Sequence, residues 1–206
     1  MIEAVNITKA FNNEAVVSDF NLKVAKGDFV AITGESGKGK TTILNMLGLL
    51  EKPDEGEVMV DGAVNLSRKA MMMAQRHKFG YLFQNYALIE NESVAANLKI
   101  ALEYRAGVDK KSAMKEALRF VNLNPSILEK RVYQLSGGEQ QRVAIARLFL
   151  KEADYVFADE PTGNLDLNNR DVVFDLLKKL NEMGKAVVYV THDLELAKKA
   201  DRWIEL

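Results

Sequence analysis

Gly34-Glu35-Ser36-Gly37-Lys38-Gly39-Lys40-Thr41-Thr42 fits the pattern G-x-x-x-x-G-K-[ST] and stands between two apolar segments, 29–32 and 43–50. A strand, a glycine-rich loop and a helix in this order form a cradle for nucleotide phosphates. The glycines let successive backbone N–H groups converge on the phosphates, because a side chain there would block the backbone angles or the approach. Lys40 then reaches the β and γ phosphates, and Thr41 offers a hydroxyl to Mg²⁺. The pattern also arises by chance in roughly one chain per hundred of this length, so a plain glycine turn before a helix is the alternative reading.

Composition excludes several classes of function. The 206 residues are 48% apolar, and 28 Lys and Arg against 29 Asp and Glu leave a net charge of -1, so no overall field attracts nucleic acid. There are no cysteines, which excludes disulfides and thiol chemistry. The N-terminal residues lack a basic segment followed by an apolar one, so we expect no signal peptide. No run of eighteen apolar residues occurs, and any role at a membrane would come through another chain.

The apolar pattern predicts an α/β fold with an inserted helical part. Residues 2–7 and 20–24 alternate between apolar and polar, as expected of an antiparallel β unit. Short apolar runs that end in polar residues predict buried strands at 154–160 and 186–193. Between residues 92 and 153 the period becomes helical. We therefore predict one domain, 1–206, in which 1–91 and 154–206 form the β unit and the phosphate-loop core and 92–153 form a helical subdomain.

Polar side chains at the ends of these strands supply candidates for catalysis. Asp159 and Glu160 end one strand, and the first can hold Mg²⁺ while the second polarises a water for attack on a phosphoryl group. Gln84 ends another and can orient water or complete the Mg²⁺ shell. His192 follows a third, at the edge where ligands collect in open α/β sheets, so a γ-phosphate contact is expected. A solvated loop amide and a capped loop histidine are the respective alternatives for Gln84 and His192.

Leu135-Ser136-Gly137-Gly138-Glu139-Gln140 opens a second notable helix. Ser136 followed three residues later by Glu139 is a capping box, which explains those two residues by local structure alone. The cap does not explain two glycines in the first turn, where each costs about 1 kcal/mol of helix propensity. Bare glycines at a helix N-terminus suit an anion, so we expect a second phosphate contact by Ser136, Gly137, Gly138 and Glu139.

Together these motifs resemble, from end to end, the nucleotide-binding subunit of an ATP-binding-cassette (ABC) transporter. In that resemblance the motifs fall in the family's order: Phe11 as the adenine-stacking aromatic, Gly34 to Thr42 as the Walker A loop, Gln84 as the Q-loop, Leu135 to Gln140 as the signature, Tyr155 to Glu160 as Walker B with its glutamate, Asn164-Leu165-Asp166 as the D-loop and His192 as the switch histidine. The wording of 158–166 is most similar to the macrolide, lipoprotein and bacteriocin exporter branch (MacB/LolD-like). Lys38 stands where the family usually has a small residue, and Thr41 replaces the commoner Ser.

The resemblance implies a P-loop NTPase (RecA-like) fold with a mainly parallel core sheet, an N-terminal antiparallel β subdomain and an inserted α-helical signature subdomain. It also implies ATP and Mg²⁺ as cofactors, with Mg²⁺ held by Thr41, Gln84 and Asp159 and catalysis by Glu160, His192 and Gln84. Two copies would face head to tail, each ATP lying between one copy's Walker A loop and the other copy's signature. We expect Lys38 to point away from the nucleotide, toward Asp166 of the other copy or a backbone carbonyl beside it.

As partners the resemblance implies a second copy and a separate transmembrane permease at the cytoplasmic face of the membrane, and no nucleic acid. Tyr86, Leu88 and Ile89 place apolar side chains in a loop rich in Asn and Glu, which predicts a docking surface for a helix of the permease. An exporter of peptide or bacteriocin, lipoprotein or drug is the expected function. The alternative is an FtsE-like signalling role, in which ATP binding moves a membrane partner and nothing is transported. A soluble ABC ATPase of DNA repair or translation is disfavoured, because such chains usually carry a long coiled-coil insertion or two cassettes in tandem.

Overall fold

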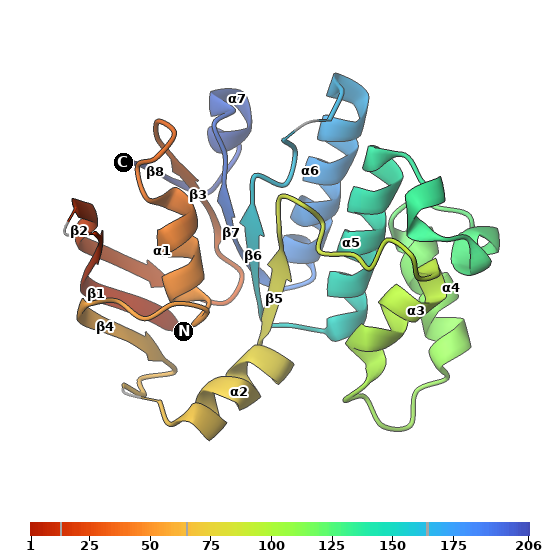
Figure 1. The fold of residues 1–206 in the computed structure, drawn as a ribbon, viewed down its shortest axis with the longest axis horizontal. Coiled ribbons are helices and arrows are strands. Elements are labelled where there is room, and N and C mark those ends of the chain that lie inside the picture. The colour runs from red at the N-terminus through yellow and green to blue at the C-terminus, as the bar shows by residue number, and fades with distance from the viewer. Residues whose placement is uncertain (13, 65, 164) are drawn as a thin grey trace.

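The fold is built from an antiparallel sheet, a parallel sheet and a group of helices (Figure 1). We describe it from a computed structural model that covers residues 1–206 except Asn13, Asn65 and Asn164. In the antiparallel sheet β1 (Ile2–Phe11) lies between β2 (Glu14–Val24) and β4 (Glu55–Val60). This sheet is the N-terminal β unit that the alternating pattern predicted.

The parallel sheet has the strand order β5-β6-β7-β3-β8, and the chain direction is the same in each neighbouring pair. Its strands are β5 (Phe79–Leu82), β6 (Tyr155–Asp159), β7 (Ala186–Val190), β3 (Phe29–Thr33) and β8 (Arg202–Glu205). Strands β3 and β7 are buried along their whole length, as expected of a sheet covered on both faces. The predicted α/β fold class is therefore confirmed.

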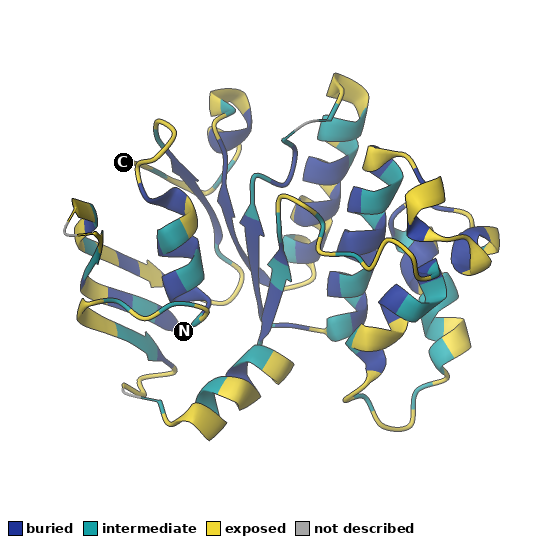
Figure 2. Cartoon of the chain, in the orientation of Figure 1, coloured by how far each residue is buried: buried dark blue, intermediate teal, exposed yellow. Residues whose placement is uncertain are grey.

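Helices cover the two faces of the parallel sheet, and alternate residues of β3 contribute to different cores. Val30 and Ile32 pack with α1 (Lys40–Leu47) and the antiparallel sheet, whereas Phe29 and Ala31 belong to the core on the opposite face. That core contains α5 (Gly137–Lys151) and α6 (Leu167–Glu182). Figure 2 shows the resulting band of buried residues along the central strands and α5.

The remaining helices lie on either side of the central sheet. Helix α2 (Arg68–His77) precedes β5, and α7 (Leu194–Ala197) lies between β7 and β8. The helical group predicted for 92–153 consists of short elements packed around α5: α3 (Val94–Lys99), η1 (Ile100–Leu102), α4 (Lys110–Phe120), η2 (Pro125–Glu129) and η3 (Val132–Gln134). Within the described residues, no helix is both long and apolar enough to cross a bilayer.

Candidate functional site

The Walker A loop connects the end of β3 to the start of α1. Gly37 and Gly39 have positive φ values of 85° and 79°, a conformation that side chains disfavour. Gly39 is also packed closely, since a Cβ there would lie 2.6 Å from the backbone oxygen of Val16. Directly after it α1 begins at Lys40, so the free N–H groups of its first turn open toward the loop. The structure thus has the cradle geometry that the glycine pattern predicted.

Lys40 is held by the backbone of its own loop. Its ammonium donates to the carbonyl oxygens of Gly34 at 2.9 Å and Glu35 at 2.7 Å, and the residue is only 9% exposed. An ammonium has three protons to donate, so one donor remains for a phosphate oxygen. Because its neighbours fix its position, Lys40 needs little reordering to meet an anion in the loop.

Thr41 and Asp159 meet at the C-terminal tip of β6. The Thr41 hydroxyl lies 3.0 and 3.1 Å from the two carboxylate oxygens of Asp159. Burial raises the pKa of the Asp159 carboxyl, and the Thr41 hydrogen bond and the charge of Lys40 act in the opposite direction. A half-buried carboxylate next to a hydroxyl is an oxygen donor set of the kind that Mg²⁺ uses with nucleotide phosphates.

Glu160 and His192 lie beside this pair, on the loops after β6 and β7. The carboxylate of Glu160 is 2.9 Å from Nδ1 of His192, with side chains 16% and 73% exposed respectively. The backbone N–H of Glu160 donates to Val190 at 3.1 Å and holds Glu160 at φ 43°, which is uncommon for a residue with a side chain. The two candidates for catalysis are therefore placed together by the ends of adjacent strands.

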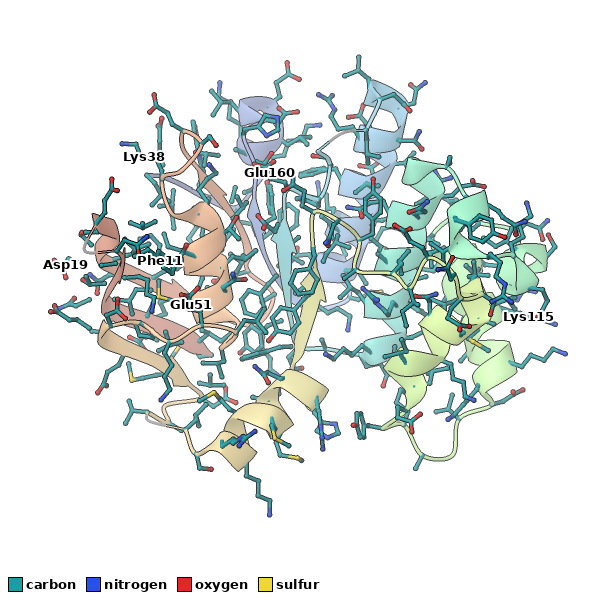
Figure 3. The ribbon with its side chains drawn as sticks, in the orientation of Figure 1. Phe11, Asp19, Lys38, Glu51, Lys115 and Glu160 are labelled. Atoms are coloured by element: carbon teal, nitrogen blue, oxygen red, sulfur yellow. The ribbon has the colours of Figure 1, made fainter. Side chains whose placement is uncertain are left out.

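A cavity of about 540 Å³ joins these residues into one site at the C-terminal edge of the sheet. Its described lining combines the loop with the tips of three strands: Val16, Gly34, Ser36, Gly37, Gly39, Lys40, Thr41, Thr42, Gln84, Glu160, Gly163, Val190 and His192. Asp159 lines an adjoining cavity of about 640 Å³, which also contains Gln84. Figure 3 shows Glu160 above the tip of β6, on the side of the sheet where the loop opens.

The side chains of Glu35 and Lys38 do not line this cavity among the described residues. Both line an adjoining cavity of about 450 Å³, which shares Gly34 and His192 with the first and also includes Glu205 and Leu206. Lys38 is labelled at the outer end of the loop in Figure 3, away from β6. Its outward direction agrees with the expectation that the long side chain leaves the phosphate cradle free. Asn164, the first residue of the predicted D-loop, lies outside the described residues.

Phe11 and the signature residues do not join this cavity. Phe11 ends β1 with 45% exposure, and the ammonium of Lys9 lies 5.6 Å from the centre of its ring. Ser136 caps α5 and forms the predicted capping box with Glu139, through contacts of 2.9 and 3.3 Å. In Figure 1 the starts of α1 and α5 face the same edge of the molecule but are separated across it. Within one copy, the two predicted phosphate contacts are therefore separate half-sites.

Gly138 has a packing role that the sequence did not reveal. A Cβ at this position would lie 2.5 Å from the side-chain oxygen of Asn169, on the first turn of α6. Asn169 in turn donates to Asp166 at 2.6 Å and accepts from Arg142 at 3.1 Å. Gly137, by contrast, is exposed and has only the Tyr86 hydroxyl near it, at 3.4 Å from an added Cβ. Close packing thus accounts for Gly138, and Gly137 is the glycine left open to a ligand.

Two further residues that the sequence analysis missed hold the loop after Gln84. Arg147 on α5 donates to the carbonyl oxygens of Ala87 at 2.5 Å and Tyr86 at 2.9 Å. Asn97, fully buried on α3, binds both the N–H and the C=O of Ile89. The sequence signal for both residues was a polar side chain on a mostly apolar helix, because such a side chain needs a hydrogen-bond partner when it is buried.

Comparison with known proteins agrees with this geometry. A sequence model described as ABC transporter matches residues 17–163. The macrolide export ATP-binding/permease protein MacB 2 of Yersinia pestis is 43% identical over 93% of the chain, but the chain spans only 29% of that protein. The lipoprotein-releasing system ATP-binding protein LolD of Aquifex aeolicus is 39% identical, with 100% of this chain and 93% of LolD covered.

Solved structures give the same result. The chain is similar to a structure titled as a dimeric post-hydrolysis state of the ATP-binding cassette MJ0796 bound to ADP and Pi. The TM-score is 0.90 at 37% identity, and the match covers 100% of this chain and 94% of that one. The MJ0796 protein of Methanocaldococcus jannaschii is 39% identical over the whole chain and 93% of its own length. With the motifs, the fold and these relatives in agreement, the chain belongs to the ABC transporter family and is an ATPase of the ATP-binding-cassette type.

Proposed function

We propose that two copies of the chain bind ATP and Mg²⁺ between them and hydrolyse ATP to drive a membrane permease. The observation that carries this proposal is the cavity at the sheet edge, where Lys40, Thr41, Gln84, Glu160 and His192 surround one space. A phosphate chain entering it meets the N-terminus of α1 and the Lys40 ammonium at one end and the Glu160 carboxylate at the other.

The residues at Asp159 fit Mg²⁺. Thr41 and Asp159 supply a hydroxyl and a carboxylate that already lie in hydrogen-bonding contact, and Gln84 lines the same region. Mg²⁺ prefers oxygen ligands and is commonly held by one or two protein groups together with substrate phosphates. When bound, the ion would neutralise charge on the β and γ phosphates and offset the cost of burying Asp159.

The protein's part in hydrolysis follows from the pair at the end of the cavity. Glu160 accepts a proton from the attacking water, whose oxygen bonds to the γ phosphorus as the bond to the ADP oxygen breaks. His192, bonded to Glu160 at 2.9 Å, keeps the carboxylate oriented and lies where it can contact the γ phosphate. Gln84, which lines the same cavity, orients the water. The products are ADP and phosphate.

A second copy would complete each site. Ser136, Gly137, Gly138 and Glu139 do not line the cavity of their own copy among the described residues, yet they open toward the same molecular edge. A head-to-tail pair related by twofold symmetry brings each signature turn onto the other copy's phosphate loop. The dimeric structures of MJ0796 support a dimer of the present chain.

The dimeric mechanism can be tested by diluting the protein. If sites form only between copies, the ATPase rate per mole of chain should rise with chain concentration at saturating ATP and then reach a plateau. A rate per mole that stays constant down to nanomolar protein would contradict the proposal. The Lys40→Ala variant is the control, because it removes the phosphate contact and should be inactive at every concentration.

Phe11 is proposed to stack on the adenine ring. We expect Phe11→Ala to weaken ATP and GTP binding alike, by about 1 to 3 kcal/mol, because stacking involves the face of a base and not its hydrogen-bonding edge. Titration calorimetry with both nucleotides measures this change. Phe20→Ala, in the neighbouring strand and packed against the core, is the control for a general effect on the sheet. Unchanged nucleotide affinity in Phe11→Ala would make this residue an ordinary surface aromatic.

A membrane partner would use a groove between α2 and the helical subdomain. This groove has a volume of about 460 Å³ and is lined by exposed apolar side chains, among them Met72, Ile100 and Tyr104. Ala87, on the loop after Gln84, also lines it, so a partner seated there would touch the loop that reaches the γ phosphate. Tyr86 and Leu88, which the sequence placed on a partner surface, are partly buried and pack on the helical core. Ile89 remains 52% exposed.

The charge of the groove indicates the partner's chemistry. Its described lining includes five basic residues and no acidic one: Arg76, His77, Arg105, Arg147 and Lys151. Burial lowers the pKa of the Lys151 ammonium, and the charge of Arg147 lowers it further. A carboxylate from the partner would offset both effects because it favours the charged ammonium, so we propose an apolar segment that carries at least one acidic residue.

Two adjacent methionines on α2 allow a matched test of the groove. Met72 lines it and Met73 does not, although both are exposed, at 39% and 47%. We expect Met72→Arg to abolish sedimentation of the chain with membrane vesicles from its own host and to leave basal ATPase activity unchanged. Met73→Arg should retain both properties. Equal membrane binding by the two variants would exclude the groove as the docking surface.

We further propose that the complete transporter is an exporter of peptide or bacteriocin, lipoprotein or drug, with this chain at the cytoplasmic face of the membrane. The names of MacB and LolD, which denote macrolide export and lipoprotein release, support an outward direction. Transport of labelled candidate cargo by vesicles that hold the chain and its permease tests it. Movement of a membrane partner without cargo transport would favour the signalling alternative.

A further inference from the structure

His192 itself makes few contacts that could fix its position. Its side chain is 73% exposed, so packing does not hold the ring, and the contact with Glu160 at 2.9 Å lies at the reacting end. The backbone on its N-terminal side is secured, because Thr191 is buried and its N–H donates to Ile32 at 3.1 Å. What holds the backbone on the C-terminal side therefore determines how well His192 is aligned.

On that side, the backbone N–H of Asp193 donates to the Thr191 hydroxyl at 3.0 Å. The Asp193 side chain adds further contacts, because Asp193 is the N-cap of α7. One of its carboxylate oxygens accepts from the backbone N–H groups of Glu195 at 2.9 Å and Leu196 at 3.2 Å. The other accepts from Nη1 of Arg170 at 3.0 Å. Arg170 and Asp193 each have a side-chain exposure of 21%, so this pair is more shielded than a surface ion pair.

Arg170 joins the loop that carries His192 to the first turn of α6. Its backbone N–H donates to Asp166 at 2.8 Å, at the end of the D-loop, and its neighbour Asn169 packs on Gly138 of the signature. The first turn of α6 thus contacts the signature turn through one residue and the His192 loop through the next. Closure of the proposed dimer would act on the signature turn and, through Asn169, on this turn of α6 in each copy.

We propose that Arg170 is a positioning residue for hydrolysis, which aligns His192 by fixing Asp193 to the first turn of α6. This inference rests on the proposed function, because it requires His192 to act on ATP. Arg170 does not line the nucleotide cavity among the described residues, so its effect passes through Asp193. It should therefore change the rate of hydrolysis and leave ATP binding intact.

Removing the guanidinium tests the proposal. We expect Arg170→Met to lower kcat about 3- to 10-fold, the size of effect that follows misalignment of a catalytic group and not its loss. The KM for ATP should change less than about twofold. Arg170→Lys should recover part of the rate. Asp193→Asn, which keeps the helix cap but removes the charge, should reproduce the loss, and the double variant should be no slower than the slower single one.

The controls separate positioning from folding and from the proposed function. Asp171→Asn removes the charge from another ion pair of Arg170, at 2.9 Å, and should leave kcat unchanged. In a His192→Ala background Arg170→Met should have no further effect on residual hydrolysis. An equal loss there, or an unchanged kcat in Arg170→Met and Asp193→Asn, would overturn the inference. If Arg170→Met fails to fold, the kcat of Asp193→Asn decides whether the inference holds. If the proposed function itself were wrong, a separate result would show it, because Glu160→Gln would then keep full ATPase activity.

Discussion

Glu160→Gln should bind ATP, hydrolyse it at least about 10²-fold more slowly than the unmodified chain and accumulate as an ATP-bound dimer. An amide cannot accept the proton of the attacking water, and general bases contribute rate factors of this order. The amide nevertheless retains the shape of the side chain and an oxygen that can accept from His192, which now lies 2.9 Å from Glu160. Hydrolysis is measured by phosphate release, and dimer formation by size-exclusion chromatography with and without ATP.

Two variants serve as references for this result. Glu129→Gln changes an exposed carboxylate at the end of η2, which lines neither the nucleotide cavity nor the cavity beside it, and should keep the hydrolytic rate. Lys40→Ala combined with Glu160→Gln should stay monomeric with ATP, because the phosphate contact is lost. A Glu160→Gln chain that turns over ATP at the normal rate would remove Glu160 from the role of base.

Gly39→Ala should be the most damaging change in the Walker A loop for stability. The left-handed backbone at φ 79° costs an alanine about 1 to 2 kcal/mol. The added Cβ would also lie 2.6 Å from the backbone oxygen of Val16, and such overpacking costs a further ~1 to 3 kcal/mol. The free energy of unfolding, measured in urea, should fall by the sum, and ATP affinity should fall with it because β2 and the loop must separate.

Gly37→Ala is the matched control within the same loop. Its φ of 85° carries the same backbone cost, yet nothing lies within 4 Å of the added Cβ. Its unfolding free energy should therefore fall by only about 1 to 2 kcal/mol. If the two variants were equally stable, the close approach of Val16 to Gly39 would not contribute to the loop's conformation.

Most of the strands, and the Walker A side of the site with the strand ends beside it, were predictable from sequence because they depend on local patterns. The runs at 29–32, 155–158 and 186–190 are apolar without interruption, and the corresponding strands β3, β6 and β7 lie inside the parallel sheet. Polar residues that end such strands, as Asp159 and Glu160 do, must come together at one edge when the strands are parallel. Chain order alone therefore predicted that Glu160 and His192 lie at the same edge of the sheet.

What could not be predicted depends on pairs that are distant in sequence. Nothing in the local pattern of α6 shows that Asn169 packs on Gly138 or that Arg170 binds Asp193, because both contacts join residues more than 20 positions apart. The same is true of Tyr86, whose apolar ring predicted a partner surface but packs on the helical core. The separation of Ser136 from the Walker A loop also arises only in three dimensions.

Mixing two inactive variants tests most directly the claim that each site is shared between copies. Lys40→Ala removes the ammonium that contacts the phosphates. Gly137→Asp places a carboxylate at a helix N-terminus, where it does not destabilise the helix but repels the phosphates of the ATP bound to the other copy. In a mixed dimer, one site carries both changes and the other carries neither. We predict that an equal mixture recovers about a quarter of the normal ATPase activity, since half of the dimers are mixed and each has one intact site. Mixing Lys40→Ala with the double variant Lys40→Ala/Gly137→Asp should recover nothing. No recovery in the first mixture, at any ratio, would contradict a site shared between copies.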